Sequence, residues 1–299
     1  MTHQLKANLM PGPALPGSSA FYLCDDLETY RYNLERLPED WIWRSRPVDY
    51  YFNQQGYRMM EFENINWDRY IAVFGCSNTV GVGLDQDSLW YTAWAKQNDF
   101  HVVNLALAGG TKETTLMNLR DLLNHAPKLP RAVSIQWTEP TRTCMWDRQG
   151  NINLASVSNS FDQDLASYYK EYILLGQQID HEWTEIRKTV QALCRLAGVS
   201  LWEYTDMMGY EHTDLEIIYP MSPQVLLPAI RQLQDINGPN LASSPELSAW
   251  FNNLARDVTS HVGMQMISRD YTAHPGVQHN TRVSKVWARW ANREQLVLG

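Results

Sequence analysis

The chain has 299 residues, an apolar fraction of 44% and a formal net charge of −8 at pH 7. This length favours one elaborated α/β domain. The acidic charge and the lack of any basic run exclude a typical nucleic-acid binder, because phosphate contacts need clustered Lys and Arg. No stretch approaches 18 consecutive apolar residues, so we expect no transmembrane helix and no membrane partner.

The N-terminal part of the chain predicts an extension rather than a regular domain. Its first residues, MTHQLKANLMPGPALPGSSAF, have one lysine and no continuous apolar stretch. They are not typical of a signal peptide, so we expect a cytoplasmic protein. Residues 1–20 predict an extended arm, 25–37 a helix, and 48–63 a small hairpin around a QQG turn signal. We expect residues 1–67 to pack on the core as one extension.

From Tyr70 onward, short apolar runs alternate with segments of helical spacing. The pattern predicts strands at 70–75, 101–107, 131–137 and 199–204, and helices at 87–97, 112–124, 161–177, 180–197, 223–235, 245–258 and 277–296. Such alternation is typical of parallel βαβ units with helices on both faces of the sheet. The predicted fold is therefore a three-layer α/β/α sandwich with a mostly parallel, flavodoxin-like central sheet. It spans residues 68–299, with a helical insertion at about 205–265.

In such sheets ligands bind beyond the carboxyl ends of the strands, and small polar residues follow the first two strands. Gly75-Cys76-Ser77 follow the first strand, where a serine can expose its hydroxyl while its backbone N–H faces inward. The segment NLALAGGT, residues 104–111, contains the end of the second strand and the turn after it, which can present a backbone N–H to a developing oxyanion. Each motif alone is also compatible with an ordinary turn or a helix cap.

A third motif, SRDYTAHPGVQH, lies before the last predicted helix and contains Asp270, His274 and His279. An aspartate can orient an imidazole so that the imidazole takes a proton from a serine. The same three residues could also be read as metal ligands. Because the five-residue spacing of the histidines is not that of a helical-face pair, we expect no metal and no cofactor. His279 is the second candidate for the base.

Taken in this order, FGCSNTVGVGL, NLALAGGT and RDYTAHPG resemble the blocks of the SGNH/GDSL hydrolase family. The resemblance covers about residues 68–142 and 265–295. It implies that Ser77 is the nucleophile and that the N–H groups of Ser77 and Gly109 form an oxyanion hole. It also implies that His274 is the general base, with Asp270 as its partner.

The sequence departs from the family pattern at two places. The family has an Asn after the third strand that donates to the oxyanion, whereas here the segment is QWTEPTR without any Asn. The Thr138 hydroxyl or the Arg142 guanidinium is the candidate replacement. Asp270 precedes His274 by four residues rather than three, so either one residue bulges out or a backbone carbonyl orients His274. Cys76 is a rival nucleophile, although we expect its side chain to point into the sheet as an inert filler.

The resemblance implies a serine esterase, an acetylesterase or carbohydrate deacetylase that forms an acyl-serine intermediate on a small-molecule or carbohydrate ester. Asn78, Trp137 and Arg142 are candidate substrate contacts, and Trp146 is a further aromatic residue near the expected cleft. An O-acyltransferase would use the same residues. The missing Asn and the altered Asp–His spacing favour a third alternative, a catalytically silent binding or structural module. An oligomer is compatible with the sequence, although no feature supports one.

Overall fold

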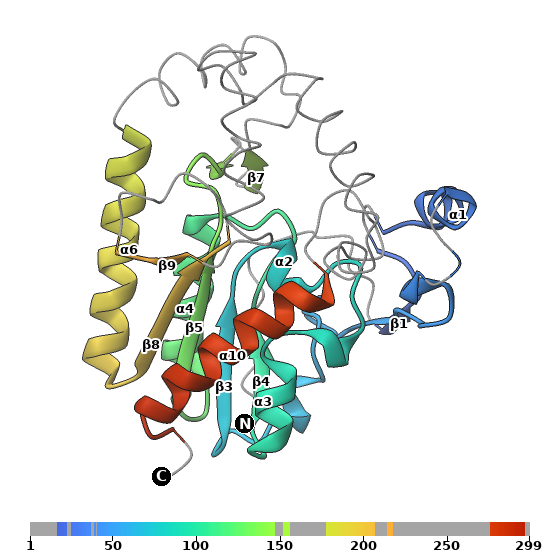
Figure 1. The fold of residues 1–299 in the computed structure, drawn as a ribbon. Helices are drawn as coiled ribbons and strands as arrows, with labels where there is room; N and C mark the ends of the chain where they lie inside the picture. The colour runs from blue at the N-terminus through green and yellow to red at the C-terminus, as the bar shows by residue number, and fades with distance from the viewer. Residues whose placement is uncertain are drawn as a thin grey trace.

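The computed structural model of the chain (Figure 1) describes residues 17–22, 25–36, 39, 41–146, 152–155, 178–206, 214–217 and 276–296. The helices expected at 161–177, 223–235 and 245–258 lie outside these residues. Asp270 and His274 lie outside them as well.

The central sheet has five parallel strands in the order β4-β3-β5-β8-β9. Their bounds are β3 (Tyr70–Phe74), β4 (His101–Asn104), β5 (Ala132–Trp137), β8 (Ser200–Thr205) and β9 (Glu216–Ile217). Numbered along the chain, the order is 2-1-3-4-5, which is that of flavodoxin-like sheets. The predicted α/β class and flavodoxin-like topology are confirmed. The carboxyl ends of β3, β5 and β8 are therefore neighbours at one edge.

Helices cover both faces of this sheet, as the sandwich prediction requires. Helices α4 (Lys112–His125) and α6 (Gln178–Ala197) pack together on one face, and α3 (Thr92–Gln97) and α10 (Val277–Arg293) lie on the other (Figure 1). Strand β3 is buried on both sides: Tyr70, Ala72 and Phe74 join the α4–α6 side, and Ile71 and Val73 join the α3–α10 side. This is the period-2 alternation of a central strand.

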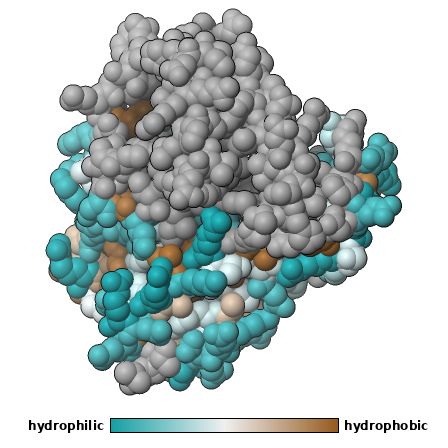
Figure 2. Space-filling model, viewed as in Figure 1, coloured by the Kyte–Doolittle hydropathy of each residue, from teal (hydrophilic) through white to brown (hydrophobic). Residues whose placement is uncertain are grey.

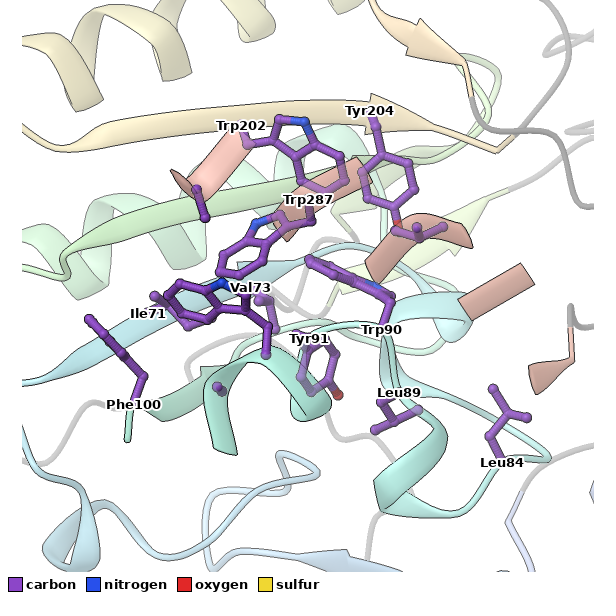
Figure 3. Close-up of a cluster of buried hydrophobic side chains, with 14 of the residues drawn as sticks. Ile71, Val73, Leu84, Leu89, Trp90, Tyr91, Phe100, Trp202, Tyr204 and Trp287 are labelled. Carbon is purple, nitrogen blue, oxygen red and sulfur yellow. The ribbon is translucent and has the colours of Figure 1, made fainter. Parts of the chain in front are cut away.

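The α3–α10 side of the core is built from aromatic rings (Figure 3). The Trp90 ring packs edge-on against the rings of Trp202 and Tyr204, with 5.6 and 5.7 Å between ring centroids. Trp94 packs edge-on against Trp287, with 4.3 Å between centroids. The Trp287 indole N–H donates to Ser134 Oγ on β5, at 2.6 Å. The outward surface is different, because the described residues on the face in Figure 2 are mainly hydrophilic, with small apolar areas between them.

The N-terminal part confirms one expected element and corrects another. Helix α1 (Leu27–Arg36) lies within the expected 25–37 segment. The hairpin expected at 48–63 is wrong: β2 (Tyr50–Phe52) pairs antiparallel with β1 (Gly17–Ser19) instead. The QQG turn does form, because the Asn53 N–H donates to the Tyr57 carbonyl. No strand follows it, and the next regular element is the short 3-10 helix η2 (Phe62–Asn64).

The structure differs from the predicted elements at two further places. The helix expected at 87–97 is divided into η3 (Gln86–Ser88) and α3, because Asp85 caps η3 and Leu89 is extended. After β5 the chain forms an antiparallel pair, β6 (Thr143–Trp146) and β7 (Ile152–Ala155), that the sequence did not predict. The remaining short elements are η1 (Ile42–Arg44) and α2 (Ser77–Val80).

Candidate active site

Ser77 is the first residue of the one-turn helix α2, which starts directly beyond the end of β3. The residue is half-buried, and its hydroxyl has no hydrogen bond to any residue that the structure describes. Gly75 makes this tight turn sterically feasible, because an added Cβ would lie 2.9 Å from Gln136 Oε1 and closer still to Thr79 Oγ1. The strand therefore delivers a serine hydroxyl to the carboxyl edge of the sheet.

The loop with Gly109 is held beside this turn by the backbone. The Leu105 N–H donates to the Val73 carbonyl at 2.9 Å, and the Leu107 N–H donates to the Gly75 carbonyl at 3.1 Å. Gly109 itself is exposed and has a left-handed φ of 74°, which a glycine adopts without strain. Within the part of the chain that the structure describes, neither the Ser77 N–H nor the Gly109 N–H has a hydrogen-bond acceptor.

A buried polar network lies beneath the Ser77 turn, centred on Gln136 and Asp206. Gln136 Oε1 accepts from Thr79 Oγ1 at 2.5 Å, and its Nε2 donates to Asp206 Oδ1 at 2.6 Å. Asp206 Oδ2 accepts from Asn78 Nδ2 at 2.9 Å. Buried polar groups need such partners, because an unpaired one is costly outside water. The network connects the first turn of α2 to the ends of β5 and β8.

His279, in the first turn of α10, completes this network. Its Nε2 lies 3.2 Å from Asp206 Oδ2, and the two side chains are 3% and 1% exposed. The other ring nitrogen, Nδ1, is buried and has no hydrogen-bond partner among the described residues. An aspartate and a histidine therefore do meet beside Ser77, but they are a different pair from Asp270 and His274.

Arg58 holds the segment that follows Ser77. Its guanidinium is buried and donates to the carbonyl oxygens of Val80, Gly81, Leu84 and Asp49, at 3.1, 2.5, 2.7 and 3.1 Å. It also lies over the ring of Tyr50, 4.4 Å from the ring centroid. A planar fork of five N–H donors is suited to several carbonyls at once. Arg58 thus holds the loop from Val80 to Leu84 from outside it, together with Tyr50, whose hydroxyl accepts from the Gly83 N–H at 2.7 Å.

The electrostatics of the turn disfavour Cys76 as a nucleophile. Burial raises the pKa of the Cys76 thiol, and the positive charge of Arg142 opposes this rise. Because the thiolate is the reactive form, a raised pKa makes the thiol unreactive near neutral pH. Arg142 and the buried Thr138 both lie near enough to Cys76 to lower the pKa of its thiol, which places them beside the Ser77 turn.

The other expected substrate contacts are engaged elsewhere. Trp137 is only 1% exposed, its N–H donates to Glu203 at 2.8 Å and its ring packs on Trp183, so it is a core residue rather than a cleft residue. The Asn78 amide is occupied by Asp206. Arg142 is half-buried, and its Nε lies 3.4 Å from Glu139 Oε2.

Sequence reasoning missed Gln136, Asp206 and Arg58, although two of them left a signal. Gln136 is an amide inside an otherwise apolar strand, RAVSIQW, whose residues from Ala132 to Trp137 are all buried. Asp206 directly follows the fourth strand, where polar side chains were expected to matter. Nothing in the sequence around Arg58 indicates that its guanidinium is buried against a loop more than 20 residues away.

Over the described ranges, the structure shows no group of three or more His, Cys, Asp or Glu side chains placed to hold a metal ion. No helix among those ranges is long and apolar enough to cross a bilayer.

Comparison with known proteins gives similar structures but no sequence relative. No protein-family model matches the sequence, and no curated protein matches it. Among solved structures, TesA is similar, with 14% identity and a TM-score of 0.39 over 76% of this chain and 99% of that one. The psychrotrophic esterase EstA from a Pseudoalteromonas species is also similar, with 13% identity and a TM-score of 0.35 over 75% and 100% of the two chains. A G-D-S-L family lipolytic protein from Desulfitobacterium hafniense has 12% identity and a TM-score of 0.37 over 74% and 98%.

Proposed function

We propose that the chain is a serine hydrolase of carboxylic esters that acts through an acyl-serine intermediate. The observation that carries the proposal is the Ser77 turn. A serine hydroxyl without a hydrogen-bond partner among the described residues lies at the carboxyl end of the central strand β3. The next two strands along the chain, β4 and β5, pair with β3 on its opposite sides. This is the topological switch point where open α/β sheets bind ligands.

In the proposed reaction the Ser77 oxygen attacks the ester carbonyl while His274 takes the hydroxyl proton. The N–H groups of Ser77 and Gly109 would donate to the oxyanion, together with the Thr138 hydroxyl or Arg142 in place of the missing Asn. His274 would then protonate the leaving alkoxide, and water would release the acid and restore the serine. Asp270 would orient His274. An acetyl group on a small molecule or a carbohydrate is the substrate class we propose.

The fixed start of α10 supports His274 as the base. Gly276 precedes α10, and its carbonyl accepts from the Asn280 N–H at 3.2 Å. Only two peptide units separate Gly276 from His274, which limits the span between their Cα atoms to about 7 Å. His279, in the same helical turn, is linked to Ser77's neighbour Asn78 through Asp206. The described start of α10 is thus linked to the Ser77 turn, which supports a base from the segment just before this helix.

The test is labelling by a fluorophosphonate probe together with hydrolysis of p-nitrophenyl acetate. We expect Ser77→Ala to abolish labelling and to lower kcat/KM to the background rate, a loss on the order of 10⁴-fold or more. Ser200→Ala is the matched control, because Ser200 begins β8 at the opposite edge of the sheet and bonds to Glu294. Turnover that persists in Ser77→Ala would contradict the proposal, and so would a wild-type chain that neither labels nor turns over.

A further inference from the structure

The buried carboxylate of Asp206 joins three segments that are far apart in the sequence. Its Oδ2 accepts from Asn78 Nδ2 at 2.9 Å and lies 3.2 Å from His279 Nε2, and its Oδ1 accepts from Gln136 Nε2 at 2.6 Å. We propose that Asp206 is a positioning residue, which ties the Ser77 turn to the start of α10 and so sets the nucleophile's position relative to the segment that carries the base. The catalytic part of this inference rests on the proposed function.

Burial makes the three contacts of Asp206 depend on one another. The side chains of Asp206 and His279 are 1% and 3% exposed, so water cannot replace a donor that is lost or displaced. Hydrogen bonds to a carboxylate are shorter and stronger than those between neutral groups, and out of water an unpaired donor is costly. The positions of the three donors are therefore coupled through the carboxylate. A shift of α10 would displace Asp206 and, through it, Asn78, the residue after Ser77.

The start of α10 is held on a second side as well. Asn280 Oδ1 accepts from the Trp90 N–H at 3.1 Å, and Asn280 Nδ2 donates to the Gly276 carbonyl at 3.2 Å. Asn280 thus links the first turn of α10 to Trp90, between η3 and α3. His279 links the same turn to Asp206, at the carboxyl end of β8. Asp206, which pairs with His279, also accepts directly from Asn78 in the Ser77 turn.

With Asn78, Gln136 and His279 oriented as in the structure, only a carboxylate at 206 accepts from all three donors. An amide of the same shape has one oxygen, and its NH₂ would face the NH₂ of Asn78 or Gln136 or the ring N–H of His279. Asp206→Asn is therefore nearly isosteric but mispaired. At position 279 the choice is different, because a glutamine can place an N–H near the position of Nε2, whereas alanine removes the donor. His279→Gln should rescue what His279→Ala loses.

The experiment compares Asp206→Asn, His279→Ala and His279→Gln with Glu203→Gln. Glu203 is the matched control, because it lies on β8, which Asp206 directly follows, but bonds to Trp137, Arg187 and Gln191 instead. We measure amide hydrogen exchange in peptides covering 77–82 and 276–282, and kcat and KM for p-nitrophenyl acetate. Asp206→Asn and His279→Ala should speed exchange in both segments. They should lower kcat by about 10- to 100-fold, as expected for misplaced catalytic groups, while KM changes by less than about twofold.

In the expected result His279→Gln restores most of kcat, and Glu203→Gln changes neither the exchange nor kcat. Faster exchange in one segment only, an equal effect of Glu203→Gln, or an unchanged kcat in Asp206→Asn would overturn the inference. If Asp206→Asn fails to fold, the His279→Ala and His279→Gln pair decides by the same criteria. If the wild-type chain shows no Ser77-dependent turnover, the proposed function fails, and the exchange result alone decides whether Asp206 joins the two segments.

Discussion

At the scale of single residues, the Ser77 turn combines a local motif with buried partners from distant segments of the chain. An apolar strand that ends in Gly-Cys-Ser can be read from the residues, because strand periodicity and glycine are local signals. The contacts of Ser77's neighbours depend on side chains at 136, 206 and 279, which only the folded sheet brings together. Gln136 and Asp206 were therefore missed, and His279 was placed only as a second choice for the base.

Thr138 tests whether a hydroxyl replaces the missing Asn donor. We expect Thr138→Val to lower kcat by about 10²–10³-fold, the usual effect of losing one oxyanion donor. Thr138→Ser keeps the hydroxyl and should retain most of the activity. Steady-state kinetics with p-nitrophenyl acetate distinguishes the two variants. Equal activity of the serine and valine variants would rule out Thr138 as a donor and leave Arg142 as the candidate.

Cys76 tests the electrostatics of the same turn. Because burial raises the pKa of its thiol, the thiolate is scarce at neutral pH and alkylation by iodoacetamide should be slow there. The rate should increase only as the pH rises beyond the usual thiol range of about 8.5. Mass spectrometry of the Cys76 peptide, native and denatured, measures this. Fast labelling of native Cys76 at pH 7 would contradict its assignment as an inert core residue.

At the scale of elements, long periodic segments were predictable and tertiary choices were not. The strand at 70–75 and the helix at 277–296 were found because their apolar spacing is regular. The hairpin at 48–63 failed because its turn signal was real but the partner of β2 comes from residues 17–19. Arg58 follows that turn, and its side chain donates to carbonyls of the loop from Val80 to Leu84.

Arg58→Lys tests whether the guanidinium holds that loop. A lysine has one compact ammonium with three N–H donors and cannot donate to four carbonyls at once, so buried acceptors lose their donors. We expect the free energy of unfolding to fall by about 2–4 kcal/mol, measured by urea denaturation. The control is Arg31→Lys on the exposed side of α1, which should cost less than about 0.5 kcal/mol. Equal stability of the two variants would mean that Arg58 does not hold the loop.

At the scale of the whole molecule, the strand order accounts for the site. The 2-1-3-4-5 order makes the ends of β3, β5 and β8 neighbours, and α10 returns the C-terminal part of the chain to the same edge. The alternation of strands and helices predicts the parallel sheet and its carboxyl edge from sequence alone. It cannot predict which polar side chains pair across that edge, since these pairs depend on the packing of helices against both faces.

Trp287 tests how α10 is joined to the sheet. It is fully buried against Trp94 and donates to Ser134, whereas Arg289 on the same helix is exposed. Trp287→Ala should lower the free energy of unfolding by about 3–5 kcal/mol. Arg289→Ala should change it by less than about 0.5 kcal/mol. A small effect of Trp287→Ala in urea denaturation would contradict the packing of α10 on the aromatic core.

The central claim is that Ser77 becomes acylated during turnover. The most direct measurement is to mix the chain with p-nitrophenyl acetate, quench in acid within the first turnover and sequence the peptides by mass spectrometry. The account predicts an acetyl group on the peptide with Ser77, located on its hydroxyl and not exceeding one equivalent per chain. Turnover with the acetyl group on Cys76, on a lysine or on no residue at all would contradict it.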